Sequence, residues 1–241
     1  RQAWGECGKH GQRRLIMNSP KIAVQYFGHE QEPVAIIDNF SPDAEHLRQY
    51  AEHATFVPDD LYYPGIKAAL PAGYFSAVQN VLATAMCDVF SFSSGADVLR
   101  ASYAIVTTPP HLLSLEQRLP HVDALDPGRM AILHYLALDN NDGTAFYRHR
   151  ATGYESVDEA RGSAYFTALN EDLRKYGAPA DAYICGDTPI FEQTGRVDGR
   201  FNRALIYRGH ILHSGAISAG RELPSDPRTG RLTIASFLTA T

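Results

Sequence analysis

The pattern of apolar and polar positions changes character near residue 98 of the chain. Before that point, two segments have apolar residues at helical spacing. One spans residues 41–56, with Ser41 as the expected N-cap and Pro42 at the first helical position, and the other spans residues 72–90. A short β-type run at residues 33–39 precedes both. We therefore predict a helical support region over residues 17–97.

From residue 98 onward, short runs rich in β-branched and aromatic residues alternate with Pro, Gly, Asn and Asp. This spacing predicts a β-sandwich or a barrel-like jelly roll over residues 98–241. One helix is expected to interrupt it at residues 157–176, with Gly177 as its C-terminal stop. The predicted strands are VLRASYAIVTT, RMAILHYLAL, GTAFYRHR, DAYICG (residues 181–186), RALIYRG and RLTIASFL.

Length and charge are those of an ordinary globular domain. A chain of 241 residues that is 44% hydrophobic can bury one sizeable core, so residues 17–241 are predicted to form a single domain. Residues 1–16 are expected to be poorly ordered or to lie upstream of a natural start at Met17. The 22 basic and 27 acidic residues give a net charge of −5 without runs of like charge, so nucleic acid is not an expected partner.

The cysteines and the hydropathy indicate the expected compartment. Cys7, Cys87 and Cys185 lie far apart with no CxxC pair, which suggests neither a disulfide framework nor a structural zinc site. The basic amino terminus lacks an apolar signal core, and no stretch of 18 apolar residues occurs. We expect a cytoplasmic protein with no membrane partner. The sequence does not predict an oligomeric state.

The main chemical signal is His121-Val122-Asp123, followed much later by His213. In an extended segment, residues two apart point to the same side, so His121 and Asp123 can present an imidazole and a carboxylate to one point. Two histidines and one carboxylate on one face of an octahedral metal form the ligand set of non-haem Fe(II) oxygenases. Zinc hydrolases also use His and Asp ligands, so the triad leaves the metal open. The competing interpretation is a polar pair that caps a strand.

The surrounding sequence resembles a known superfamily. The segment MAILHYLALDNNDGTAFY resembles the strand, turn and strand that follow HxD in prolyl-hydroxylase-like 2-oxoglutarate oxygenases, and GRLTIASFL resembles their last core strand. Residues 98–241 are thus similar to the iron(II)/2-oxoglutarate-dependent dioxygenase superfamily. Two segments, GTAFYRHRATGYE and FNRALIYRGHILHSG, resemble a bacterial family of unknown function within it. The resemblance implies an α+β fold with a mainly β core, a double-stranded β-helix (jelly roll) with N-terminal helices and one inserted helix.

The resemblance also implies the cofactors and the residues that hold them. Fe(II) would be bound by His121, Asp123 and His213, with O2 and 2-oxoglutarate as cosubstrates. Arg231 would grip the far carboxylate of 2-oxoglutarate, since a guanidinium can form two parallel charge-assisted hydrogen bonds. The other expected residues of this pocket are Thr233, Tyr135 and Thr144. For Tyr135, a core aromatic residue is an equally supported interpretation. The segment between His213 and Arg231 is longer than is usual, and it contains two rivals for the carboxylate, Arg221 and Arg228, in a predicted loop.

Other polar residues near these motifs have a structural and a functional interpretation. His210 would face away from His213 in a strand, and we favour His213 as the ligand. His134, within an apolar run, is interpreted as a core histidine, while His111 and His149 are expected at the surface or in a pocket. Arg148 and Arg150 are candidate substrate-binding residues or solvated strand ends. Asn202 is a further candidate for substrate binding. Asn202 and Arg208 are also candidates to orient the metal ligands.

The predicted function is hydroxylation of a C–H bond in a small-molecule or amino-acid-like substrate. The presence of Asp123 disfavours halogenation, because halogenases of the superfamily vacate the carboxylate position for chloride. One alternative is a catalytically silent jelly-roll module that binds a structural metal. Another is a cupin-like zinc hydrolase, which would have no use for Arg231.

Overall fold

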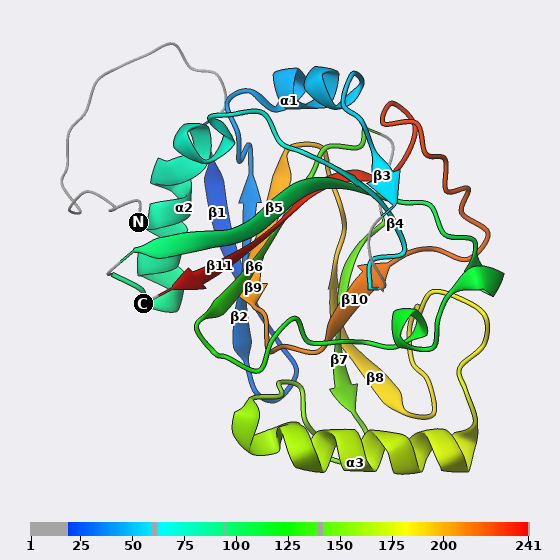
Figure 1. Ribbon diagram of the computed structural model, residues 1–241. Helices are drawn as coiled ribbons and strands as arrows, with labels where there is room; N and C mark the ends of the chain where they lie inside the picture. Colours follow the sequence, from blue (N-terminus) through cyan, green and yellow to red (C-terminus); the bar gives the residue numbers. More distant parts are fainter. Residues whose placement is uncertain (1–18, 59–61, 94, 139–141, 241) are drawn as a thin grey trace.

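The computed structural model describes residues 19–58, 62–93, 95–138 and 142–240. The extension expected at residues 1–16 lies outside this part of the chain. Within it, two antiparallel sheets and three α-helices form the molecule (Figure 1). Two short 3-10 turns, at Pro110–Leu112 and Glu116–Arg118, lie in the connection that leads to His121.

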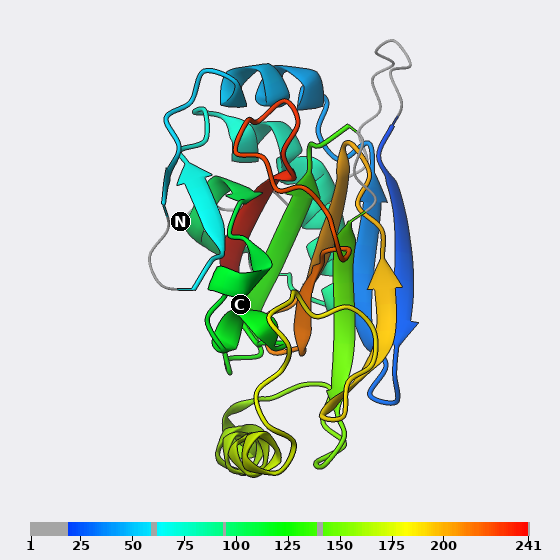
Figure 2. The ribbon, with the colours of Figure 1, turned by 90° about the vertical axis from the view of Figure 1, so that its right-hand side faces the viewer.

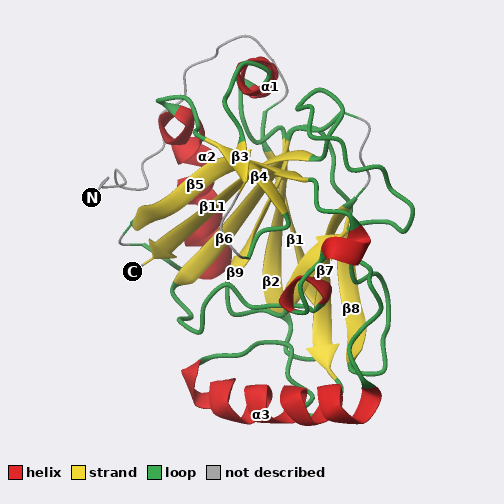
Figure 3. Ribbon diagram, turned by 45° about the vertical axis from the view of Figure 1, so that its right-hand side comes forward, coloured by secondary structure: helices red, strands yellow, loops and turns green. Residues whose placement is uncertain are grey.

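The larger sheet has eight strands, and neighbouring strands lie side by side in Figure 3. All neighbouring pairs are antiparallel. In spatial order the strands are β1 (Lys21–Phe27), β2 (Glu32–Asp38), β9 (Arg203–Arg208), β6 (Arg129–Tyr135), β11 (Leu232–Ala240), β5 (Ala96–Val106), β4 (Gly65–Ala68) and β3 (Val57–Pro58).

The smaller sheet has three strands, in the order β10 (His213–Ala216), β7 (Gly143–His149) and β8 (Phe191–Val197). Its inner face packs against the larger sheet, where the Phe146 ring meets the Tyr207 ring edge-on at 5.4 Å between centroids. Strand β9 reads as a continuous apolar run because residues 204–207 are buried on both faces of the sheet. The inner faces of the two sheets thus enclose one of the hydrophobic clusters.

Two helices pack against the larger sheet, and the third runs across one end of the smaller sheet (Figure 1). The helices α1 (Ala44–Ala51) and α2 (Tyr74–Phe90) bury their apolar stripes against the larger sheet, and Val78 and Leu82 of α2 are almost fully buried there. Helix α3 (Glu159–Tyr176) belongs to a separate cluster with the smaller sheet, through Tyr165. Figure 2 shows α1 and α3 at opposite ends of the molecule. No helix in the described part of the chain is long and apolar enough to cross a membrane.

Most elements predicted from the pattern form, with four corrections. Asp43, not Ser41, is the N-cap residue of α1, and the Ser41 hydroxyl instead accepts a hydrogen bond from the Asp43 backbone N–H at 3.2 Å. Residues 181–186 form no strand. Strand β8 was not predicted, because only its first and last residues are buried and no alternation is visible in FEQTGRV. The segment 17–97 supplies strands β1–β4 as well as two helices.

Candidate metal centre

Backbone pairing brings His121 and His213 together. Each donates its backbone N–H to the carbonyl of the other, at 2.9 Å from His121 and 3.0 Å from His213, as an isolated antiparallel bridge beside strand β10. Asp123 donates its backbone N–H to the Gly209 carbonyl at 2.7 Å. The HxD segment is therefore fixed at both ends to the segment that carries His213.

The three side chains converge on one point. Asp123 Oδ1 lies 3.7 Å from His121 Nε2, and Asp123 Oδ2 lies 3.5 Å from His213 Nε2. One ligand atom from each of the three residues lies within 4.8 Å of the other two. Neighbouring ligands of an octahedral metal, at bond lengths of roughly 2.1 Å, stand about 3 Å apart. Small side-chain rotations bring the three groups to that spacing, and His121 has room for one because half of its side chain is exposed.

The local hydrogen bonds leave the ligand atoms of His213 and Asp123 free. His213 Nδ1 lies 2.8 Å from the Ile211 carbonyl, which can only accept, so Nδ1 carries the proton and Nε2 has a free lone pair. Burial lowers the pKa of His213 to about 4, so this imidazole is neutral at pH 7. Asp123 Oδ2 is buried without a hydrogen-bond partner, and burial raises the pKa of this carboxyl to about 6. A divalent cation would satisfy both groups.

Arg231 lies at the head of strand β11 and is 6% exposed. Its Nη2 donates to the Gly143 carbonyl at 2.8 Å, its Nε is buried without a partner, and its guanidinium stands 5.6 Å from the Tyr135 ring centroid. A Cβ added to Gly215 would lie 4.0 Å from Arg231 Nη2. The cation therefore faces the β10 segment two residues beyond His213 and keeps donors free for an acceptor.

The other residues expected to bind 2-oxoglutarate line the same interior. The Tyr135 hydroxyl and Thr144 Oγ1 are hydrogen-bonded at 2.8 Å, and both residues are buried. Thr233 donates its hydroxyl to the Ala104 carbonyl at 3.2 Å. The rival arginines have other partners: Arg228 Nε donates to Glu52 at 3.0 Å, and Arg221 Nε lies 3.6 Å from Asp142.

The three residues considered for substrate binding have protein partners of their own. Arg148 pairs with Glu155 at 2.7 Å, Arg150 pairs with Asp187 at 3.0 Å, and the Asn202 amide donates to the Ser41 carbonyl at 2.9 Å. No hydrogen bond or ion pair joins any of the three to the triad within the described residues. Through these contacts, the three side chains support neighbouring segments of the chain.

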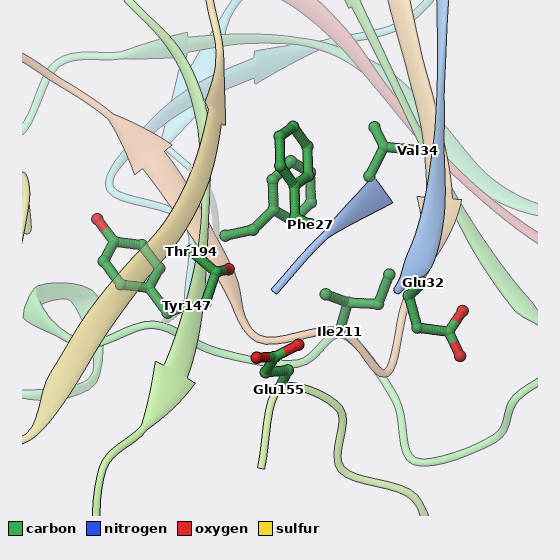
Figure 4. Close-up of a pocket in the computed structure, with 8 residues that line it drawn as sticks. Phe27, Glu32, Val34, Tyr147, Glu155, Thr194 and Ile211 are labelled. Atoms are coloured by element: carbon green, nitrogen blue, oxygen red, sulfur yellow. The ribbon is translucent and has the colours of Figure 1, made fainter. Parts of the chain in front are cut away.

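Two cavities lie elsewhere in the molecule. A space of about 10 Å³, large enough for one water, lies between strands β1, β2, β7 and β8, and Figure 4 shows residues of its wall. A hollow of about 450 Å³ lies between the start of α2 and strand β5. Neither is lined by the triad or by Arg231.

Comparison with known proteins places the chain in a family. The model of a family of unknown function, DUF6445, matches residues 18–238. The chain belongs to this family. No curated protein matches the DUF6445 chain significantly.

Two solved structures similar to the DUF6445 chain are those of HygX from Streptomyces hygroscopicus, with nickel and 2-oxoglutarate bound, and of an N-substituted L-amino acid dioxygenase from Burkholderia ambifaria AMMD. HygX aligns with a TM-score of 0.49 and 16% identity over 88% of this chain and 84% of its own. The dioxygenase aligns with a TM-score of 0.46 and 12% identity over 93% of this chain and 97% of its own. At these scores neither likeness decides the function.

Three other histidines of the DUF6445 chain have partners outside the triad. His210 Nε2 lies 3.7 Å from Glu32, away from the triad. His134 accepts a hydrogen bond from the Tyr74 hydroxyl at 3.3 Å and donates to Asn202 Oδ1 at 3.1 Å, as expected for a core histidine. The expectation for His149 was wrong, because this residue is fully buried beneath α3, where its Nε2 lies 3.2 Å from Asp172.

Sequence reasoning missed three residues near the centre. The Tyr207 ring packs edge-on against the His213 ring, with centroids 4.8 Å apart. Arg100 and Arg129 lie close enough to Asp123 for their charges to lower its pKa, against the larger effect of burial. All three come from strands of the larger sheet. Only the pairing of distant strands brings them to the HxD segment, so no local motif announces them.

Proposed function

We propose that this protein is an Fe(II)- and 2-oxoglutarate-dependent oxygenase that hydroxylates a C–H bond of a small-molecule or amino-acid-like substrate. One observation carries the proposal: two histidines and one aspartate, remote in sequence, converge within 4.8 Å of one another. The partner-free Oδ2 of Asp123 and the free lone pair on His213 Nε2 fit a divalent metal. The facial triad leaves the remaining metal positions for cosubstrates.

The buried arginine supports 2-oxoglutarate in particular. Arg231 has an unpartnered donor, and a dicarboxylate that reached the metal with one end would present its other carboxylate to such a cation. A zinc hydrolase or a silent metal-binding module gives no reason for a cation at this place, because burying a guanidinium with open donors is costly unless an anion completes it. The hydrogen-bonded pair of Tyr135 and Thr144 is proposed to line the same pocket.

The reaction proposed is R–H + O2 + 2-oxoglutarate → R–OH + succinate + CO2. When bound, the iron supplies the oxygen chemistry that decarboxylates 2-oxoglutarate and oxidises the C–H bond. The chain's own residues do the rest: the His213–Ile211 hydrogen bond orients one ligand, Arg231 anchors the cosubstrate, and apolar residues between the sheets exclude water. Asp123 occupies the position that halogenation would require to be vacant.

The same features favour a double-stranded β-helix as the fold description. Two antiparallel sheets face each other, and the HxD segment pairs with strand β10 at one edge of the smaller sheet. In this arrangement, the proposed iron site lies at the open end between the sheets, where His121 is half exposed.

Succinate release tests the proposal. The purified protein with Fe(II), O2 and 2-oxoglutarate is expected to release succinate slowly even without substrate, and Asp123→Ala is expected to release none. Without O2, Fe(II) and 2-oxoglutarate together are expected to give a weak visible charge-transfer band that zinc does not give. Full turnover by Asp123→Ala, or hydrolase activity with zinc and no band with iron, would overturn the proposal.

A further inference from the structure

Arg129 and Asp123 lie against the same glycine. A Cβ added to Gly209 would lie 3.2 Å from Arg129 Cγ and 3.3 Å from Asp123 Cβ. The Gly209 backbone N–H donates to the Arg129 carbonyl at 2.7 Å, and the Gly209 carbonyl accepts from the Asp123 N–H at 2.7 Å. The stem of Arg129 is therefore fixed next to the carboxylate of the candidate metal centre.

Arg100 projects from the same face of the larger sheet. Strand β11 lies between β5 and β6, with Phe237 opposite Arg100 and Thr239 opposite Arg129. Phe237 and Thr239 are two apart and share a face, and Phe237 packs against the cluster between the two sheets. The Arg100 guanidinium stands 5.3 Å from the Phe237 ring centroid. Strands two places apart are roughly 10 Å apart, a gap that two arginine side chains can span.

Neither guanidinium forms a hydrogen bond or an ion pair with another residue in the described part of the chain. Arg129 Nε is buried without a partner, whereas Arg100 is exposed at its end of strand β5. By contrast, Arg203 on the larger sheet and Arg148 on the smaller sheet each have a carboxylate partner at 2.7 Å. Two cations near the single charge of Asp123 give this side of the candidate metal centre an excess of positive charge.

We propose that Arg129 and Arg100 bind a carboxylate of the substrate, so that the substrate is a small carboxylic acid held with a C–H bond toward the metal. The planar fork of a guanidinium matches a carboxylate, and an acid placed there would satisfy the buried donor of Arg129. This inference rests on the proposed oxygenase function and specifies its substrate class. It gives the site two separate anion-binding ends, with Arg231 for the cosubstrate and the Arg129–Arg100 pair for the substrate.

Matched pairs of compounds test the substrate class. Succinate release is measured with Fe(II), O2 and 2-oxoglutarate in the presence of free L-amino acids, their N-acetyl derivatives, the carboxamides of both sets, and phosphomonoesters of the hydroxyl amino acids with their carboxyl groups amidated. At least one acid is expected to raise the rate several-fold above the substrate-free rate, and its carboxamide is not.

Substitutions assign the effect to the two arginines. For an acid that stimulates, Arg129→Gln and Arg100→Gln are each expected to raise its KM roughly 10-fold or more, as expected for loss of a charge-assisted hydrogen bond. Arg129→Lys is expected to recover part of the loss. Arg174→Gln, which removes an exposed positive charge from α3, is the matched control and is expected to leave that KM unchanged. Binding of Co(II), followed by its visible spectrum, shows whether each variant keeps an intact centre.

The outcomes separate this inference from the function on which it rests. An absence of succinate under every condition would overturn the oxygenase function itself. Substrate-free succinate release that no acid increases, stimulation by carboxamides or only by phosphomonoesters, or an unchanged KM in Arg100→Gln and Arg129→Gln would overturn the carboxylate site alone. Because Arg100 is exposed, its variant is informative even if an Arg129 variant fails to fold.

Discussion

The side chain of His213 is oriented by the residue two positions before it. Its Nδ1–H donates to the Ile211 carbonyl at 2.8 Å, so Nε2 faces Asp123 with a free lone pair. This hydrogen bond to a backbone carbonyl fixes both the tautomer and the ring direction before any metal arrives.

Removal of a triad ligand is expected to weaken metal binding strongly. His213→Ala and Asp123→Ala should each bind Fe(II) or Co(II) at least ~100-fold more weakly, because loss of a ligand costs more than the 10- to 100-fold seen for outer partners. Isothermal titration calorimetry measures the affinity. His46→Ala, at an exposed position of α1, is the control and should bind the metal normally. Equal affinity in the His213 variant would show that this residue is not a ligand.

Substitution of Arg231 is expected to impair cosubstrate binding while leaving the metal in place. Arg231→Gln should raise the KM for 2-oxoglutarate roughly 10- to 100-fold, the cost of losing charge-assisted hydrogen bonds. Arg231→Lys should recover part of it. Steady-state succinate kinetics measure the effect, with Arg228→Gln as a control because Arg228 is exposed and paired with Glu52. A larger increase in this KM from Arg228→Gln would show that Arg228, and not Arg231, binds the far carboxylate of 2-oxoglutarate.

The buried His134 is expected to make folding less favourable in acid. Burial lowers its pKa from 6.5 to about 4. Between these values the unfolded chain binds a proton that the folded chain does not, so the free energy of unfolding falls as the pH drops from about 6.5 to 4 and levels off below. The contribution is about 3 kcal/mol from one residue.

Urea unfolding at pH 7.5 and pH 5 measures this effect. His134→Gln, which can still pair with Tyr74 and Asn202, is expected to lose less stability between the two pH values than the parent protein. Identical losses in the two proteins would mean that His134 is protonated in the folded state.

The N-cap of α3 is expected to contribute measurably to stability. Asp158 accepts a hydrogen bond from the Arg161 backbone N–H at 2.9 Å. Asp158→Ala should lower the free energy of unfolding by about 1 kcal/mol. Thermal unfolding followed by circular dichroism detects the change, and Glu171→Ala, at an exposed site of the same helix, should have little effect. An equal loss in both variants would point to a general effect of removing acidic charge.

Local patterns in the sequence determined much of the fold. The helical spacing at residues 72–90 and 157–176 corresponds to α2 and α3, and Gly177, with φ of 81°, ends α3 as expected. Short runs rich in β-branched and aromatic residues, separated by turn residues, predicted strands β5, β6, β7, β9 and β11. Both signals repeat within a few residues and need no distant partner. For the same reason, the sequence alone placed His121 and Asp123 on one side of an extended segment.

Only the tertiary structure decided which residues lie next to the segment that carries His121 and Asp123. Strand pairing brings His213 to His121 and places His210 beside Glu32, and it sets Arg231 behind Tyr135. It also brings Arg129 to Asp123, for which no motif exists. The physical reason is that side-chain direction within a strand follows a period of two, whereas the neighbours of a strand depend on which distant strand pairs with it and in which register.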